Sequence, residues 1–116
     1  MKDDLHLVHE FAVNRSEAAF ATLVRRHVNL VWSAARRQVN DAALAEEVTS
    51  AVFCVLAEKA GSLNRETVLA GWLVRTTRFV AVNALRREAR RRQREEEAMN
   101  ILLDQAAPDT AWQHIR

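Results

Sequence analysis

The segment 71–94 concentrates the side chains best suited to binding phosphate. Its sequence, GWLVRTTRFVAVNALRREARRRQR, holds eight arginines and one acid, Glu88, so its charge is 8 − 1 = +7 against +2 for the whole chain. The remainder of the chain therefore sums to 2 − 7 = −5. A guanidinium group is planar and always charged, and it can hold a phosphate through two parallel hydrogen bonds. The pattern predicts a surface that binds a polyanion.

On a helix, this segment separates into an apolar face and a basic face. The predicted core positions are Leu69, Leu73, Thr77, Val80 and Ala84. The opposite face interleaves arginines with an aromatic ring and an amide: Arg75, Arg78, Phe79, Asn83, Arg86 and Arg90, with Trp72 at its border. Beyond residue 85 the apolar stripe is broken by Arg87 and Arg91. We expect the helix to leave the core there and to continue as a basic extension.

The same segment has a plainer interpretation as a solvated helix end, since runs of one charge often serve as tails. Phe79 could also pack against a neighbouring helix of the same domain. A bulky aromatic side chain on a charged face favours instead a surface that a ligand covers.

The composition is that of a helical protein. The 116 residues include two glycines, one proline and no tyrosine, and no β-strand pattern competes. We expect one all-α domain, a compact bundle of three to four helices with a long C-terminal arginine-rich helix. No uncharged run is long enough to cross a bilayer, and the first residues lack the apolar core of a signal peptide, so a cytoplasmic location is expected. The single cysteine, Cys54, agrees with a reducing compartment.

Apolar periodicity predicts two helices at the start of the chain. The first covers residues 4–13, with Leu5, Val8 and Ala12 on its inner side. The second follows a Ser16 cap and runs to about residue 39. His27 lies in the middle of its apolar face, which favours a hydrogen-bonded core histidine over a ligand.

A third helix is predicted from an Asn40–Asp41 cap to about residue 60. Its inner stripe is Leu44, Val48, Ala51, Val52 and Val55, while Glu46, Ser50 and Phe53 project to the other side with Glu47 at the edge. Phe53 either belongs to a docking patch with these acids or is covered by the first helix.

The loop 61–67 separates this helix from the arginine-bearing one. Asn64 is the expected cap of that last helix, which should end near residue 96. We assign residues 1–98 to one helical domain. Residues 99–116, which contain Pro108, are assigned to a linker and a fresh helical start that stops mid-pattern, so we expect the natural chain to continue.

The sequence lacks arrangements suited to catalysis or to metal and cofactor binding. His6, His9 and Glu10 do not supply the ligand set of a helical metal site. Glu46 and Glu47 are adjacent and point about 100° apart, so they cannot act as one acid–base pair. We expect no enzymatic activity, no metal and no cofactor.

The run from residue 20 to about residue 97 resembles region 2 of bacterial sigma factors, particularly the extracytoplasmic-function (ECF) group. The first shared block is FATLVRRHVNLVWSAARR, which opens with Phe20 and Leu23. The second is DAALAEEVTSAVF, which matches the family at Asp41, Ala45, Glu46 and Phe53. The third is GWLVRTTRFVAVNALRREARRR. The three blocks occur in the family's order and at its spacings.

The resemblance implies a transcription initiation factor with two macromolecular partners. Core RNA polymerase would be bound through the clamp helices of its β′ subunit, by a helix carrying Glu46, Glu47, Ser50 and Phe53. Promoter DNA would be bound at the −10 element, whose non-template strand yields a flipped base. The DNA-contacting residues would be Asn64, Arg65, Trp72, Arg75, Arg78, Phe79, Asn83, Arg86, Arg87 and Arg90. An anti-sigma factor is a further implied partner. The resemblance also implies a second helical domain with a helix-turn-helix. Residues 99–116 would then hold the start of this missing C-terminal domain, with Trp112 and Ile115 in its first helix.

Four positions depart from the family pattern. Glu47 replaces the usual Asp and Ser50 a frequent Gln, whereas Phe79 stands where Asn is common and Asn83 where Asp is common. The last two alter the DNA-facing surface, so the promoter sequence does not follow from the resemblance.

Two other function classes fit parts of the pattern. A helical interaction module could bind an acidic regulatory protein through the same basic face. A basic amphipathic helix could lie on anionic membranes. Phosphate binding would weaken steeply with salt, which distinguishes it from docking through Phe53 and Trp72.

Overall fold

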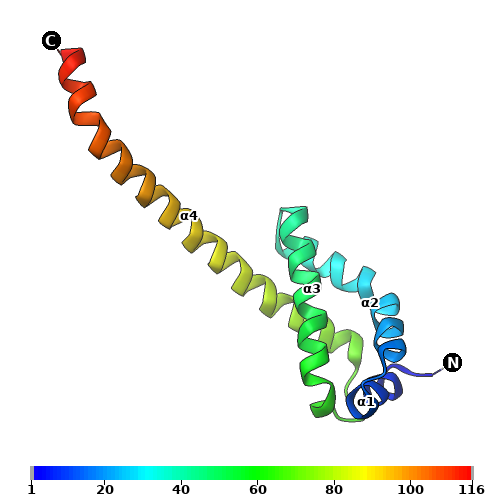
Figure 1. The fold of residues 1–116 in the computed structure, drawn as a ribbon. Helices are drawn as coiled ribbons and strands as arrows, with labels where there is room; N and C mark the ends of the chain where they lie inside the picture. The colour runs from blue at the N-terminus through cyan, green and yellow to red at the C-terminus, as the bar shows by residue number, and fades with distance from the viewer. Residues whose placement is uncertain (1, 116) are drawn as a thin grey trace. The chain divides into compact units, whose positions relative to one another are not determined.

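The computed structural model describes the backbone of residues 2–115 and the side chains of residues 2–106. Four α-helices follow one another: α1 (Asp4–Asn14), α2 (Glu17–Gln38), α3 (Ala42–Lys59) and α4 (Leu69–Ile115), with a short 3-10 turn, η1 (Ala60–Ser62), after α3 (Figure 1). No strand occurs within residues 2–115, so the predicted all-α class is confirmed. The chain divides into two compact units, residues 1–84 and 85–116, and each is described by itself.

Local capping signals set the starts of the first three helices. The side chains of Asp3, Ser16 and Asp41 accept hydrogen bonds from the backbone N–H groups of His6, Ala19 and Ala43 respectively. Such caps satisfy amide groups that the first turn of a helix leaves unpaired. The predicted caps at Ser16 and Asp41 are confirmed.

The turn between α1 and α2 is sharp because Arg15 adopts a left-handed conformation, with φ of 52°. Its backbone N–H donates to the Phe11 carbonyl, which ends α1. The Arg15 guanidinium lies 4.8 Å from the centre of the Phe11 ring, and that ring packs 4.8 Å from Phe20 of α2. These contacts join the end of α1 to the start of α2.

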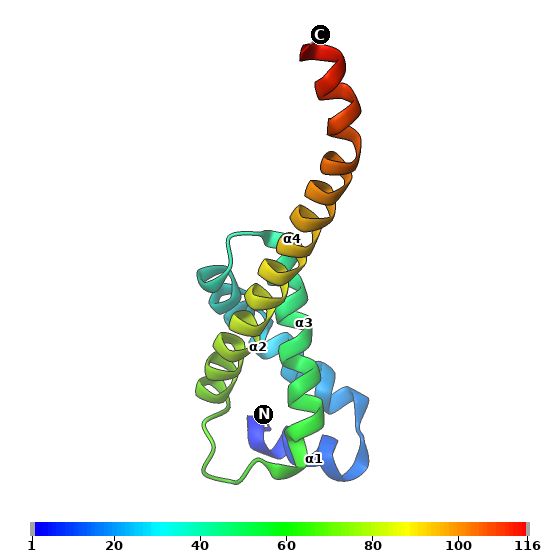
Figure 2. The same cartoon turned by 90° about the vertical axis from the view of Figure 1, so that its left-hand side faces the viewer.

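The core of the first unit lies between α1, α2, α3 and the first part of α4. In this unit α2 contacts both α1 and α3, and η1 lies against α1 (Figure 2). The fully buried large side chains are Leu23, Val31, Val39, Val48, Val52, Leu56, Leu73 and Thr77. Ala45 and Ala81 are also fully buried, which lets the helices approach closely at those positions.

The inner face of α3 differs from the predicted stripe. Ala51 and Val55 are only half-buried, whereas Ala45, Thr49 and Leu56 are buried. The buried face is rotated relative to the predicted stripe and is wider than it, since the buried residues of α3 span about half of the helix circumference.

Phe53 lies at the edge of this wider face and is 7% exposed. The prediction that it projects outward with Glu46 and Ser50 is therefore wrong, and the alternative of a covered ring is correct. Phe53 belongs to the hydrophobic core cluster and is not available as a surface docking residue.

The first part of α4 presents the predicted apolar face to the core. Leu69, Leu73, Thr77 and Ala84 are buried as expected, while Val80 is half-buried and Ala81 takes its place inside. The Thr77 hydroxyl donates to the Leu73 carbonyl at 2.6 Å. A polar group can be buried at little cost when it is hydrogen-bonded in this way.

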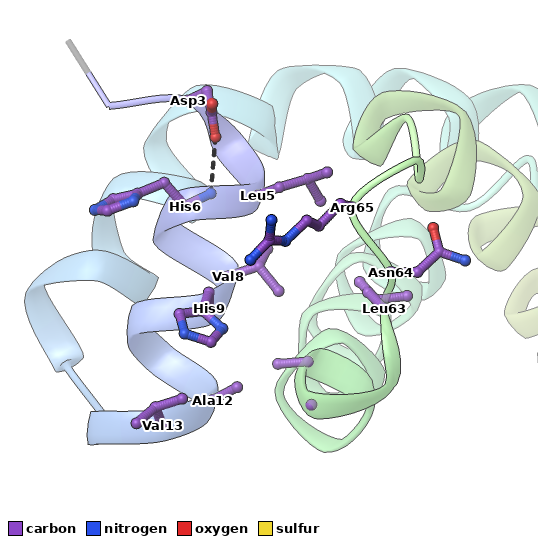
Figure 3. A pocket seen from close by; sticks show the side chains of 12 residues that line it. Asp3, Leu5, His6, Val8, His9, Ala12, Val13, Leu63, Asn64 and Arg65 are labelled. Carbon is purple, nitrogen blue, oxygen red and sulfur yellow. Dashed lines mark hydrogen bonds between the residues drawn. The ribbon is translucent and has the colours of Figure 1, made fainter.

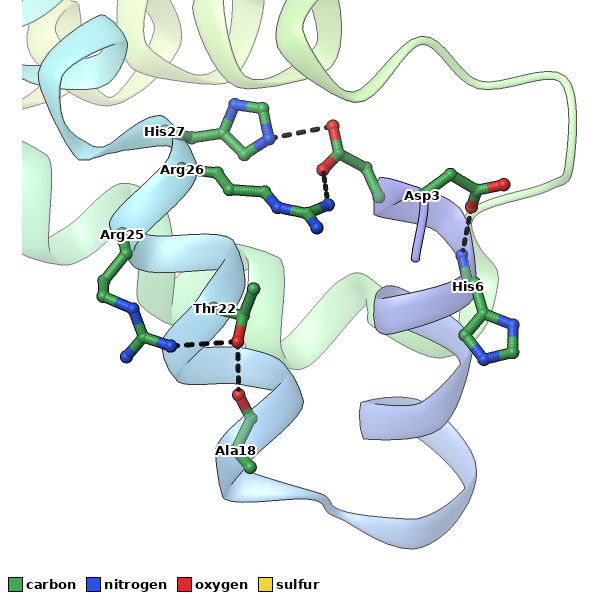
Figure 4. Close-up of polar contacts among 8 residues, drawn as sticks. Asp3, His6, Ala18, Thr22, Arg25, Arg26 and His27 are labelled. Carbon is green, nitrogen blue, oxygen red and sulfur yellow. Dashed lines mark hydrogen bonds and ion pairs between the residues drawn. The ribbon is translucent and has the colours of Figure 1, made fainter. Parts of the chain in front are cut away.

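Asp4 ties α1 to α2 through two charged contacts. One carboxylate oxygen accepts from Arg26 Nη1 at 3.1 Å, and the other lies 2.9 Å from His27 Nε2 (Figure 4). His27 is mostly buried, with 12% of its side chain exposed. The prediction of a hydrogen-bonded core histidine is confirmed.

The second unit consists of the continuation of α4, from residue 85 to Ile115. The predicted helix end near residue 96 is wrong. Residues 95–107 are mostly Glu, Ala, Met, Leu and Gln, all good helix formers, and they carry no glycine that would favour a stop. The predictions for Pro108, Trp112 and Ile115 concern side chains outside the described ones. None of the helices within the described residues has the length and apolarity needed to span a membrane.

Replacing Asp4 with asparagine is expected to lower the free energy of unfolding by about 1 kcal/mol, since the two contacts are partly buried but still screened by solvent. For a domain of this size that change corresponds to a melting temperature lower by roughly 4–8 °C. Thermal unfolding followed by circular dichroism measures the difference. Glu58→Gln, which removes a carboxylate from the exposed surface of α3, serves as the control and should unfold like the parent. An equal loss in both variants would contradict a specific role for Asp4.

Candidate nucleic-acid interface

The outward face of α3 is acidic and polar. Glu46, Glu47 and Ser50 are all exposed, as the sequence predicted for Glu46 and Ser50. They occupy the side of the helix opposite its buried stripe. Cys54 is exposed on the same face, one turn after Ser50. This face can present carboxylates and a hydroxyl to another protein.

Asn64 organises the loop ahead of α4 and does not cap that helix. Its side-chain oxygen accepts from the Glu66 N–H at 2.9 Å and from the Thr67 hydroxyl at 3.2 Å, and its carbonyl accepts from the Thr67 N–H at 3.2 Å. Because α4 begins only at Leu69, Asn64 is too far from its first turn to cap it. An asparagine that bonds its own backbone two residues on closes a local turn. The predicted cap is therefore wrong, although the residue does fix the loop.

A hollow of about 370 Å³ lies between this loop and the start of α4. Its lining combines polar loop groups with an aromatic ring and a cation: Asn64, Glu66, Thr67, Val68, Trp72 and Arg75. Trp72 is half-buried and packs against the core cluster, so its ring is held in place. The structure thus brings together three of the predicted DNA-contacting residues, Asn64, Trp72 and Arg75.

A second hollow of about 340 Å³ lies on the α3 side of α4. Trp72 and Arg75 line it as well, together with Phe79, Lys59 and Leu63. The Phe79 side chain is 70% exposed, which confirms the prediction that no helix of the domain covers it. A methyl group on Gly71 would lie 3.4 Å from Arg75 Nη1, so this guanidinium folds back along the helix over the glycine.

Arg65 lies at a different place from the other predicted residues. It lines a hollow of about 540 Å³ between α1 and the loop, where its side chain points toward α1 (Figure 3). His6 and His9 of α1 line the same hollow. Asn64 borders this hollow too. The histidines of α1 were not predicted to share a surface with the loop, because their proximity depends on how α1 packs against η1.

Lys59, Thr67 and Val68 also line these hollows and were not predicted to do so. The charge of Lys59 just ahead of the loop is the sequence signal that could have indicated it, whereas the 73% exposure of Val68 is a property of the fold. Arg78 and Asn83 are exposed on the first part of α4 as predicted.

In the second unit Arg86, Arg87 and Arg90 are exposed. Arg91 is held by acids of its own helix, with Nη2 2.8 Å from Glu88 Oε2 and Nη1 2.8 Å from Glu95 Oε1. The hydrogen bond to Arg91 holds the pKa of Glu88 below its usual value, and the same carboxylate raises the pKa of Arg91. The charge of Arg91 is therefore compensated by two acids of its own helix.

The first unit thus combines the groups that single-stranded nucleic acid needs. An exposed ring can stack an unpaired base, hollows with amide and hydroxyl groups can take a base edge, and guanidinium groups can contact phosphates. No group of acids, histidines or cysteines that could hold a metal ion occurs among the described residues. The ring, the hollows and the guanidinium groups of the first unit suit the binding of a nucleic-acid strand.

Comparison with known families gives one match. Residues 23–91, more than half of the chain, match the family model described as Sigma-70 region 2. Searches of curated proteins and of solved structures returned no match. Core RNA polymerase and promoter DNA are the partners that membership in this family implies. The chain therefore belongs to the sigma-70 family as a region 2 domain, a helical, non-enzymatic domain of transcription initiation.

Proposed function

We propose that this domain acts in an ECF-type sigma factor, where it binds the β′ clamp helices of core RNA polymerase and captures one flipped base of the −10 element. The two tasks would fall to different surfaces of the first unit. The acidic face of α3 would contact polymerase. The loop and the first part of α4 would contact the non-template strand.

On the polymerase side, Glu46, Glu47 and Ser50 form the proposed docking surface. Their exposure supports this role, since they stand on a helix whose other face is fixed in the core. Phe53 contributes indirectly, because its buried ring holds the orientation of α3. An anti-sigma factor could regulate the domain by covering this face.

On the DNA side, the flipped base would enter the hollow lined by Asn64, Thr67 and Trp72. Its volume of about 370 Å³ lies within the range of pockets that take small organic groups. The neighbouring unpaired base would stack on Phe79. Arg75 and Arg78 would contact the phosphates between and beside these bases, and Arg86, Arg87 and Arg90 would add phosphate contacts farther along α4.

The observation that carries this proposal is the exposed Phe79 ring, which lines the hollow on the α3 side of α4. Trp72 and Arg75 line both this hollow and the neighbouring one that would take the flipped base. Isolated arginines would serve any polyanion. An uncovered ring next to a pocket with polar walls favours nucleic acid whose bases are unpaired. The cytoplasmic location expected from the sequence agrees with this role.

Glu47→Lys is expected to weaken binding to core RNA polymerase at least about tenfold, since reversing a charge inside a docking surface leaves unpaired or repelling groups. Co-purification with core enzyme and fluorescence anisotropy of the labelled chain measure the effect. Glu58→Lys makes the same charge change on the same helix about 16 Å farther along, eleven residues at 1.5 Å each. Similar losses in both variants, or none in Glu47→Lys, would contradict the assigned surface.

Phe79→Ala is expected to lower affinity for single-stranded −10 DNA by about 1–3 kcal/mol with little change in salt dependence, because stacking involves no counterion. Arg78→Ala should instead reduce the slope of log K against log salt by about 0.7, as one phosphate contact is lost. Titrations at several salt concentrations separate the two effects. Val13→Ala, at another exposed apolar position, is the control. A salt slope that changes equally in both test variants would argue against stacking on Phe79.

Asn64→Asp is expected to keep the loop folded, because the carboxylate retains the acceptor that Glu66 and Thr67 use. The melting temperature should stay within about 2 °C of the parent, whereas affinity for single-stranded DNA should fall because an anion replaces an amide beside the strand. Asn64→Ala, which removes the acceptor, should lower both the melting temperature and the affinity for single-stranded DNA. If Asn64→Asp binds single-stranded DNA as tightly as the parent, the proposed contact between Asn64 and the flipped base is contradicted.

A further inference from the structure

The second unit carries apolar side chains that nothing in it covers. Met99, Leu102 and Leu103 are more than half exposed, and Leu85 is 41% exposed. At 100° per residue, Leu85, Arg92, Met99 and Leu103 share one stripe with Ala89 and Glu96 on its edge. Ile101 is equally exposed but lies on the opposite side of the helix and does not belong to this stripe. A stripe with this spacing is typical of a helix that packs against another helix.

The charges along the same helix change sign at one point. From residue 85 to 94 there are six arginines and one acid, Glu88, giving 6 − 1 = +5, while residues 95–106 hold three glutamates and Asp104, giving −4. A helix whose two halves carry opposite charges is complementary to a second copy of itself that lies antiparallel, because each basic half then faces an acidic half. A uniformly acidic or uniformly basic partner would match only one half of this pattern, whereas a second copy matches both halves.

The apolar stripe and the charge reversal agree on a single register. With a two-fold axis at residue 94, each residue faces a residue of the second copy, and the two residue numbers of such a pair add up to 188. Leu85 then faces Leu103 of the second copy, Ala89 faces Met99, and Arg92 faces Glu96. The two-fold axis repeats every pair once on either side of it, and the two pairs nearest the axis each bring Arg92 of one copy against Glu96 of the other. A polar layer inside an otherwise apolar seam is a feature that fixes register and orientation in paired helices.

We propose that residues 85–103 of two copies pair as an antiparallel helical dimer through Leu85, Ala89, Arg92, Glu96, Met99 and Leu103. Most helical stability in proteins comes from tertiary packing of an apolar face, and within the second unit Leu85, Met99 and Leu103 are exposed. Pairing would cover these three side chains, whereas Leu102, about 100° away from the stripe, would stay outside the seam. The inference goes beyond the proposed function and is tested without polymerase or DNA, so failure of one leaves the other standing.

Sedimentation of the whole chain from micromolar to millimolar concentration tests the proposal. The mass should rise with concentration from 13.2 kDa toward twice that value. Arg92→Glu should raise the dimer dissociation constant at least about tenfold, because each dimer then holds two contacts between glutamates. The double variant Arg92→Glu with Glu96→Arg should restore the parental constant, which a folding defect could not do.

The matched control is Arg94→Glu, which makes the same charge change at a position pointing away from the stripe. It should dimerise more tightly than Arg92→Glu. Leu103→Gln tests the apolar layer and should also weaken pairing. A chain that stays monomeric up to millimolar concentration would overturn the proposal, as would a dimer that Arg92→Glu leaves unchanged or that the double variant fails to restore. In the monomeric case, the exposed stripe would belong to a contact with a different protein.

Discussion

The burial of one face of the first part of α4 is the constraint on which the proposed DNA-facing surface depends. Leu69, Leu73 and Thr77 are sealed in the core, so the helix cannot rotate about its axis. Since side-chain directions follow from helical geometry, Phe79 and Arg78 must then point away from the core. A ring that would otherwise be drawn into an apolar interior is kept at the surface by the residues that precede and follow it. The function of the exposed face is thus determined by the packing of the hidden one.

Local signals in the sequence were sufficient to predict where the early helices begin. Ser16 and Asp41 each supply an acceptor just ahead of an apolar repeat, and that chemistry involves only neighbouring residues. The width and direction of a buried face are different, because they depend on how many helices surround it. Phe53 was therefore assigned to the wrong side of α3. The exposure of Phe79 was predicted correctly because arginines dominate the face of the helix on which it lies.

The candidate site was predictable in its residues and less so in its arrangement. Asn64 was predicted to cap α4, but it closes a turn within the loop instead. Which role it takes depends on where α4 begins, at Leu69, and periodicity alone does not fix that position. Arg65 was grouped with the DNA-contacting residues, yet it lines a hollow against α1. The end of α4 was placed near residue 96, but the helix-forming composition of residues 95–107 allows the helix to continue.

The energies of the proposed DNA contacts explain why the two surfaces need to be on one rigid unit. Stacking one base on Phe79 contributes on the order of 1–3 kcal/mol, and extracting a base from duplex DNA costs a few kcal/mol. Arginine contacts add affinity for phosphates but do not by themselves distinguish an open strand from a duplex. The domain alone therefore lacks a surplus of free energy to open promoter DNA. Binding of α3 to polymerase would supply it by holding the loop and Phe79 against a strand that the whole complex bends and separates.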